Sequence, residues 1–232
     1  QHCGYFKKPE SNDFTIAPKF EAMEIKTDYI SLDVLDKYFD YKNTSNLQKW
    51  LLSKFTKIQV RDAEYDYFLC AKGESVIFWQ IDQLDRIRSG KVMDYNSKTG
   101  KRTKDAFGKS NISWMHKQPY NLKQCLFGLH LMNAYKYKPI GIVESEKTAV
   151  IMSIAEPRLL WMACGSMSGF KLDYLAPLRL RKIIAFPDKG CFDKWQEVAT
   201  SLTDLGFDII VNDVLENNIN ANLGDDIADH VL

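Results

Sequence analysis

The sequence lacks long apolar runs, a cysteine framework and a surplus of charge. Of its 232 residues, 45% are hydrophobic and 26% are charged, which is ordinary for a globular protein. No apolar run is long enough to span a membrane, and no charged-then-apolar leader opens the chain. The cysteines are odd in number and scattered (Cys3, Cys70, Cys125, Cys164, Cys191). A disulfide framework is therefore disfavoured, and a reducing, cytoplasmic location without membrane contact is expected.

Several motifs are also missing. There is no internal repeat, no Gly-x-x-x-x-Gly-Lys-Ser/Thr loop of a helicase motor, and no Ser-His-Asp or Cys-His arrangement. The first residue is Gln rather than Met, so we expect the chain to begin partway through a longer protein. The opening segment 1–5, Gln-His-Cys-Gly-Tyr, is typical of the end of a zinc ribbon, but one Cys and one His cannot supply the roughly four ligands of a structural zinc. Zinc is expected only if the rest of a ribbon lies upstream.

Charge is unevenly distributed although the net charge is only +1. Residues 86–123 carry ten Lys and Arg against two Asp, whereas residues 203–232 carry seven acids and no Lys or Arg. A phosphate-binding surface beside a metal site would need this arrangement. Two oppositely charged solvated faces would explain it equally well.

The first part of the chain predicts an α+β subdomain over residues 1–136. Apolar spacing of three and four predicts helix within 27–55, interrupted at 43–45. Segments 58–60, 67–70, 75–81 and 91–95 are predicted as strands, and 96–102 is predicted as a turn rich in small and basic residues.

The second part, residues 137–232, alternates strands and helices. Strands are predicted at 140–143, 159–164, 182–186 and 208–211, with helices after the first strand and at 192–205. Continuous apolar strands of this kind indicate a parallel sheet with helices on both faces. The fold class is therefore α/β, preceded by a smaller α+β subdomain, with a boundary near residue 137.

Acidic residues follow the predicted parallel strands. Glu144 follows the first strand, Asp188 follows the third, and Asp225 and Asp226 come after the fourth. Ligands gather at the carboxyl ends of strands in open parallel sheets, and carboxylates there would suit Mg²⁺. The same residues also have plain structural interpretations. Glu144 could be a helix N-terminal acid and Asp188 a turn residue, and Asp225 and Asp226 could cap a helix.

Three segments resemble the motifs of the Toprim domain. Residues 142–149, Ile-Val-Glu-Ser-Glu-Lys-Thr-Ala, resemble its strand ending in Glu, and 183–190, Ile-Ile-Ala-Phe-Pro-Asp-Lys-Gly, resemble its Asp-x-Asp strand end. Residues 224–232 resemble the closing acidic segment of phage and bacterial primases, and the order of the segments matches as well. The resemblance covers residues 137–232. The combination of the Cys-Gly-Tyr step, a middle segment and this Toprim-like region is similar to replication and mobilisation primases of Bacteroides-type mobile elements.

The resemblance implies roles for particular residues. Glu144 would act as general acid or base, while Asp188, Asp225 and Asp226 would hold Mg²⁺ or Mn²⁺, with Asp229 as an auxiliary. Single-stranded DNA and nucleotides would be partners, and a helicase is left open as a further one. The sequence departs from the motif at Gly190, where the second aspartate is usual; this puts two-metal chemistry in doubt, and Asp193 would substitute only if the loop folds back.

Several basic residues are candidate contacts to nucleic acid. Lys98, Lys101, Arg102 and Lys104 form either a phosphate-binding loop or a solvated hairpin tip, and Lys147 would meet a phosphate or nucleotide. Tyr95 and Trp114 would stack on bases or belong to the core. The favoured function is a primase-like nucleotidyltransferase. A Toprim nuclease and a non-catalytic nucleic-acid-binding module of a mobile-element replication protein stay open.

Overall fold

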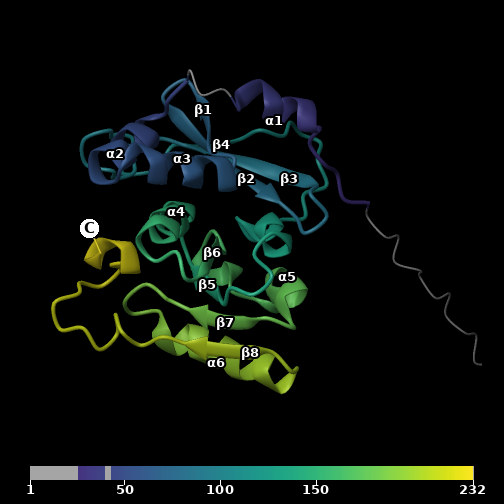
Figure 1. Ribbon diagram of the computed structural model, residues 1–232, viewed down its shortest axis with the longest axis vertical. Helices are drawn as coiled ribbons and strands as arrows, with labels where there is room; N and C mark the ends of the chain where they lie inside the picture. Colours follow the sequence, from purple (N-terminus) through teal and green to yellow (C-terminus); the bar gives the residue numbers. More distant parts are fainter. Residues whose placement is uncertain (1–25, 40–42, 232) are drawn as a thin grey trace, which may run out of the picture.

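The computed structural model describes residues 26–39 and 43–231, which form two sheets with helices packed against them (Figure 1). The segment predicted to end a zinc ribbon, residues 1–5 with Cys3, lies outside the described residues. The described helices include none with the length and apolarity needed to cross a membrane.

The first sheet is antiparallel, in the order β1-β2-β3-β4. Its strands are β1 (Cys70–Lys72), β2 (Ser75–Ile81), β3 (Ile87–Met93) and β4 (Ile112–Trp114). Because side chains alternate along a strand, Ile77 and Trp79 face one hydrophobic cluster and Val76 and Phe78 face another. Both faces of this sheet are therefore buried along β2 and β3, whereas β4 is exposed.

Helices cover both faces of the antiparallel sheet (Figure 1). Helix α1 (Leu32–Tyr38) packs on the Trp79 face, and α2 (Asn46–Lys54) and α3 (Lys57–Asp66) lie on the other face. The strand predicted at 58–60 is wrong, because these residues belong to α3. Thr56 and Gln59 form a capping box that starts a helix there, and Val60 faces the core while Ile58 is exposed.

The second sheet is fully parallel, as predicted, and its strand order is β6-β5-β7-β8. Its strands are β5 (Ile140–Val143), β6 (Leu160–Ala163), β7 (Lys182–Ala185) and β8 (Asp208–Val211). Helix α4 (Glu146–Ala155) packs on β5 and β6, and α6 (Phe192–Asp204) packs on β8. The predicted α/β class with helices flanking a parallel sheet is confirmed.

Shorter helices complete the fold. They are η1 (Leu129–Asn133), η2 (Met167–Gly169), α5 (Leu172–Leu175), η3 (Ala176–Leu178) and η4 (Ile227–His230). One hydrophobic cluster runs from the antiparallel sheet to the parallel one, with α3 packed against α4 between them (Figure 1). The domain boundary near residue 137 stays a prediction.

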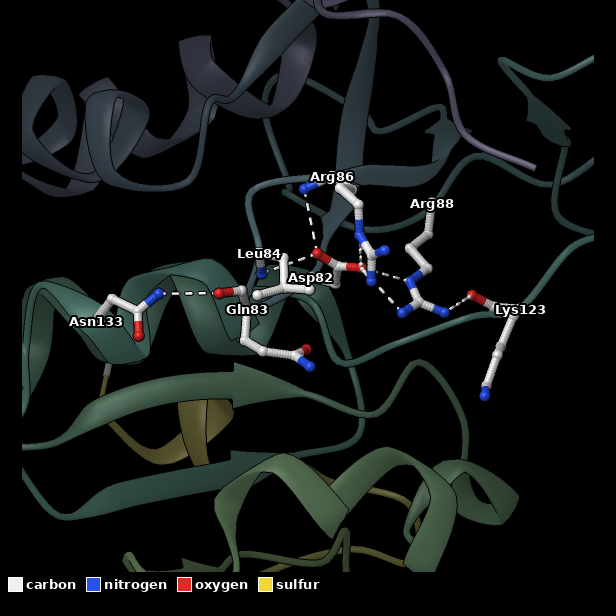
Figure 2. A network of polar contacts seen from close by, with 7 residues as sticks. All are labelled: Asp82, Gln83, Leu84, Arg86, Arg88, Lys123 and Asn133. Carbon is white, nitrogen blue, oxygen red and sulfur yellow. Dashed lines mark hydrogen bonds and ion pairs between the residues drawn. The ribbon is translucent and has the colours of Figure 1, made fainter. Parts of the chain in front are cut away.

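The turn between β2 and β3 is organised by a buried carboxylate (Figure 2). Asp82 Oδ2 accepts hydrogen bonds from the side chains of Arg86 and Arg88, and Oδ1 accepts from the backbone N–H groups of Leu84 and Arg86. Burial acts to raise the pKa of Asp82, but these hydrogen bonds outweigh it and the pKa is lowered. Two cations of the basic segment 86–123 are therefore engaged within the fold.

Candidate functional site

The carboxyl edge of the parallel sheet contains a topological switch point. From β5 the chain first adds β6 on one side and then β7 on the other. Crevices at such points are where ligands bind in open α/β sheets. Glu144 directly follows β5 and so lies at this point, as the sequence predicted from the strand end.

A tight loop after β6 holds the backbone around Glu144. The Cys164 N–H donates to Val143 O, and the Gly165 N–H donates to Glu144 O at 2.8 Å. Gly165 has a φ of +79°, a conformation that glycine adopts without strain. The loop following β6 is therefore bound to the chain at the end of β5.

Burial raises the pKa of the Glu144 carboxyl, and the nearby charge of Glu146 adds to this effect. A hydrogen bond from the Met167 backbone and the charges of Arg102 and Lys91 oppose it. A carboxyl held in this balance retains a proton to higher pH than a free glutamate does. This is the property that a general acid or base at this edge requires.

Asp188 follows β7 and lies among other carboxylates. Burial raises its pKa to about 7, and the charges of Glu144, Asp226 and Asp229 add to the effect, while Arg102 opposes it. The fold thus brings Glu144, Asp188 and Asp226 into one electrostatic neighbourhood, although they are far apart in sequence. A cation bound among them would relieve the repulsion.

The two adjacent aspartates near the C-terminal end of the chain differ in their contacts. Asp226 caps η4, with Oδ1 accepting from the N–H groups of Ala228 and Asp229, and its Oδ2 accepts from Thr148 Oγ1 at 2.5 Å. Asp225 Oδ2 instead accepts from Asn222 N and lies 3.4 Å from His230 Nε2. Asp229 adds to the raised pKa of Asp188, and its Oδ2 accepts from the Asp226 N–H at 3.0 Å.

The departure at Gly190 has a structural basis. Gly190 has a φ of +88°, and a Cβ there would lie 2.3 Å from Leu223 Cδ1. Asp193 lies exposed in the first turn of α6, outside the loop that carries Asp188 and Gly190. The loop therefore gives no sign that Asp193 replaces the usual second aspartate of the motif.

The acids fit an open metal site better than a closed one. Within the described residues, no three His, Cys, Asp or Glu side chains are grouped so that they could hold a metal ion. Mg²⁺, however, is usually held by one or two carboxylates, with water and substrate phosphate completing its six ligands. Asp188 fits this requirement, whereas Asp226 would first have to exchange its hydrogen bonds to Thr148 and to the start of η4.

Sequence reasoning missed a buried ion pair behind the acids. Lys91 Nζ lies 2.9 Å from Glu146 Oε1 and 3.1 Å from Oε2, and it joins β3 to the start of α4. Lys91 is paired in register with Phe78, so it faces inward among apolar residues. The signal that could have revealed this pair is a lysine in an apolar strand, because a lysine buried there needs a counter-charge.

The basic loop 96–111 lies beside the acids. Lys98, Lys101, Arg102 and Lys104 are all exposed on it, and Arg102 acts on the pKa values of both Glu144 and Asp188. Gly100 packs the loop onto Trp50, since a Cβ there would lie 2.2 Å from the indole ring. Lys147 Nζ lies 5.7 Å from the centroid of the Trp50 ring. Of the predicted phosphate contacts, Arg102 thus lies close enough to the acids to act on them, whereas Tyr95 is buried in the core.

Comparison with solved structures identifies the fold. The RNA polymerase domain of Mycobacterium tuberculosis primase DnaG matches with a TM-score of 0.52 at 12% identity, over 85% of this chain and 76% of that one. The primase fragment of the bacteriophage T7 primase-helicase protein matches with a TM-score of 0.46 at 17% identity, over 73% of this chain and 64% of that one. The first of these two matches shows a fold like that of a primase RNA polymerase domain. The chain spans less than two thirds of the T7 fragment.

Comparison with known sequences identifies the family. No curated protein matches the sequence. A family model described as a domain of unknown function (DUF6371) matches residues 45–189, which run from the N-cap of α2 to the residue after Asp188. The matched segment includes both members of the Lys91–Glu146 pair, as well as Glu144. Because the match covers more than half of the chain, the protein belongs to this family, the domain of unknown function DUF6371.

Proposed function

We propose that this chain is a primase-like nucleotidyltransferase with a Toprim-type acidic centre, acting on single-stranded DNA. One observation carries the proposal: Asp188 has a pKa raised to about 7 among the carboxylates of Glu144, Asp226 and Asp229, at the switch point of the parallel sheet. The fold likeness to the RNA polymerase domain of the M. tuberculosis primase supports it. The relation to mobile-element primases and a helicase partner belong to the same proposal.

Each residue of the centre has a role in this proposal. Asp188 and Asp226, with Asp225 or Asp229 as an auxiliary, would bind Mg²⁺ or Mn²⁺, which would supply charge neutralisation at the phosphates of the incoming nucleotide. Glu144 would hold and release a proton at its carboxylate, for which its raised pKa is suited. Arg102 would orient a phosphate beside the acids.

The basic loop would hold the template strand. Lys98, Lys101 and Lys104 are exposed, and lysines so placed bind phosphates without reading sequence. Lys147 at the start of α4 would meet the same strand or the nucleotide. Such contacts release counterions, so that the affinity falls with salt by a slope of about 0.7 for each phosphate neutralised on a single strand.

Primer synthesis on a single-stranded template with Mg²⁺ or Mn²⁺ and nucleoside triphosphates tests the catalytic part. We expect labelled product from the wild type, and a loss of about 100-fold or more in Glu144→Gln and in Asp188→Asn. Asp193→Asn, which changes an exposed aspartate on α6, is the matched control and should stay active. Cleavage without synthesis would replace the proposal with a nuclease, and binding alone would replace it with a non-catalytic module.

The salt dependence of binding tests the template-binding part. Lys98→Gln, Lys101→Gln and Lys104→Gln should each lower the salt slope for single-stranded DNA by about 0.7. Lys182→Gln removes an exposed lysine at the start of β7 and should leave the slope unchanged. If all four variants keep the salt slope of the wild type, the basic loop does not contact the DNA phosphates.

A further inference from the structure

A small cavity lies between the two sheets, next to the acidic centre. Its volume is about 150 Å³, and its first wall is the inward face of the antiparallel sheet, with Gln80, Lys91 and Trp114. Lys91 and Trp114 are register partners on β3 and β4, so they share this face. The second wall comes from Glu146, Ser166 and Tyr174 of the parallel half.

Gln80 brings an unused acceptor to this cavity. The residue is only 4% exposed, and its Oε1 has no hydrogen-bond partner among the described residues. It alternates with Trp79 along β2, and this places it on the face that carries Val76 and Phe78 and looks toward the parallel half. Buried amide oxygens are nearly always hydrogen-bonded, so this oxygen is suited to an N–H donor that enters the cavity.

A donor lies on the same cavity. The Tyr174 hydroxyl donates to Gln124 Oε1 at 2.9 Å, which fixes the Gln124 amide with its NH₂ group as the remaining hydrogen-bonding side. A molecule in the cavity would therefore meet one amide acceptor and one amide donor. Glutamine amides pair in this way with the donor and acceptor edge of a nucleobase.

The charge of the cavity excludes an anionic ligand. Among the described residues that line it, the only cation is Lys91, and both Oε atoms of Glu146 accept hydrogen bonds from that Nζ at 2.9 and 3.1 Å. An entering phosphate or carboxylate would have to compete with Glu146 for the only ammonium group. The lining is therefore suited to a neutral, polar ligand.

Size and shape restrict the ligand further. A volume of about 150 Å³ is well above the roughly 10 to 15 Å³ that a cavity needs, on the same measure, to hold a single water, so the cavity has room for one flat heterocycle. Trp114 is 37% exposed, so part of its indole is left uncovered beside the cavity. Aromatic side chains stack on bases without regard to sequence.

We propose that this cavity binds the base of a nucleotide, with Gln80 and Gln124 pairing to its polar edge and Trp114 stacking against it. The cavity shares Glu146, Cys164 and Gly165 with the surroundings of Glu144, so the ribose and phosphates of a seated nucleotide would extend toward the acidic centre. The role of this base recognition in primer synthesis rests on the proposed function, whereas the binding of a base in the cavity does not.

Free nucleosides probe the cavity without involving the metal or the phosphates. Adenosine, guanosine, cytidine and uridine are titrated in EDTA, and binding is detected by saturation transfer to the base protons. We expect binding by the wild type and a loss of at least tenfold in Gln80→Leu, while Gln196→Leu on the exposed face of α6 keeps the affinity. Ser166→Phe, which fills the cavity from an exposed loop position, should also abolish binding. This second variant tests the cavity even if Gln80→Leu fails to fold.

The outcomes separate this inference from the proposed function. No nucleoside binding by folded wild type, equal binding in Ser166→Phe, or displacement of nucleosides by inorganic pyrophosphate would overturn it, even if primer synthesis proceeds. Nucleoside binding that depends on Gln80 would support it, even if no primer is made and the proposed function fails. In Glu144→Gln, we expect nucleoside binding to persist while synthesis is lost.

Discussion

Lys91 Nζ lies 2.9 Å from Glu146 Oε1, with the two side chains only 9% and 2% exposed, and this pair connects the antiparallel sheet to the first turn of α4. Both residues are surrounded by the core that the two sheets share. Both charges are largely removed from solvent, so each depends on the other for its compensation. The pair therefore fixes the position of the sheet relative to the helix that follows Glu144.

Replacing one residue of the Lys91–Glu146 pair should lower the free energy of unfolding much more than replacing both. Lys91→Met or Glu146→Gln leaves the other group buried without its counter-charge, and we expect a loss of about 3 to 5 kcal/mol in the free energy of unfolding. Lys91→Met combined with Glu146→Leu should lie within about 1 to 2 kcal/mol of the wild type, since two apolar groups then pack together. Urea unfolding measures all three variants, with exposed Lys182→Met as the control. Additive losses in the double variant would contradict the coupling.

Asp188 should make the protein less stable as the pH rises. In the unfolded chain this carboxyl ionises near its ordinary pKa of 3.8, but in the fold its pKa is raised to about 7 by burial and by Glu144, Asp226 and Asp229. Between these values the folded state keeps a proton that the unfolded state has released. Its contribution to stability is thus fully present below pH 4 and is lost as the pH rises through 7.

Asp188→Asn is expected to remove this dependence. At pH 8 in EDTA the variant should be more stable than the wild type by about 1 to 3 kcal/mol, and at pH 4 the two should be nearly equal. Thermal unfolding across this pH range measures the difference. Asp193→Asn is the control, because that aspartate is exposed on α6. A stability gain that is the same at pH 4 and pH 8 would show that Asp188 ionises normally.

Gly190 should resist replacement by the aspartate that the Toprim pattern would place there. Its φ of +88° costs a residue with a Cβ about 1 to 2 kcal/mol, and the new Cβ would also meet Leu223 at 2.3 Å. Gly190→Asp should therefore destabilise the chain without raising primer synthesis. Gly224→Ala is matched in φ, at +85°, and has open space around it. Because Leu223 is 85% exposed and its Cδ1 is the close atom, this side chain can turn aside, so Gly190→Ala and Gly224→Ala should cost nearly the same in urea unfolding. A much larger cost at Gly190 would show that Leu223 is held in place.

The parallel half could be predicted well from sequence because its signals are local. Each strand is a short apolar run, and the acids come directly after strand ends, so the order of elements also indicates which edge they share. The antiparallel half was predicted less well. Segment 58–60 is rich in β-branched residues, but the capping box of Thr56 and Gln59 outweighs this preference.

The site was predicted only in part because some of its features depend on tertiary contacts. Glu144 and Asp188 were found from strand ends, whereas the pairing of Lys91 with Glu146 joins residues that are 55 positions apart. The sequence also could not tell which cations of the basic segment are free. Arg86 and Arg88 are engaged by Asp82, and this became apparent only in the fold.

Gly100 is expected to control the placement of the basic loop. It has a φ of +64°, and a Cβ there would lie 2.2 Å from the buried Trp50 ring, which cannot move without disturbing α2. Gly100→Ala should cost about 3 kcal/mol and weaken the binding of single-stranded DNA, since the loop carries Lys98 and Lys101. Gly108→Ala, in the same loop with a φ of +78° and open space, is the matched control. If Gly100→Ala is destabilised but binds single-stranded DNA as the wild type does, the loop is not part of the DNA-binding surface.

Asp82 should stabilise the β2–β3 turn more than any exposed acid near it. Its Oδ2 accepts from Arg88 Nε at 2.9 Å, and Arg88 is itself buried, so Asp82→Ala leaves that guanidinium without its counter-charge. We expect a loss of about 3 kcal/mol or more in urea unfolding at pH 7. Asp85→Asn changes an exposed residue of the same turn with a φ of +58°, which Asn tolerates, and should change little.

The pH dependence of the Asp82 variant provides an independent check. Because hydrogen bonds from Arg86, Leu84 and Arg88 outweigh burial, the pKa of Asp82 is lower in the folded chain than its ordinary value of 3.8. Its stabilising contribution is therefore fully present above pH 4 and is lost as the pH falls through the lowered pKa. The gap between wild type and Asp82→Ala should thus stay constant from pH 8 to pH 5 and narrow only in stronger acid. A gap that narrows already near pH 6 would show that the carboxylate is not held by these hydrogen bonds (Figure 2).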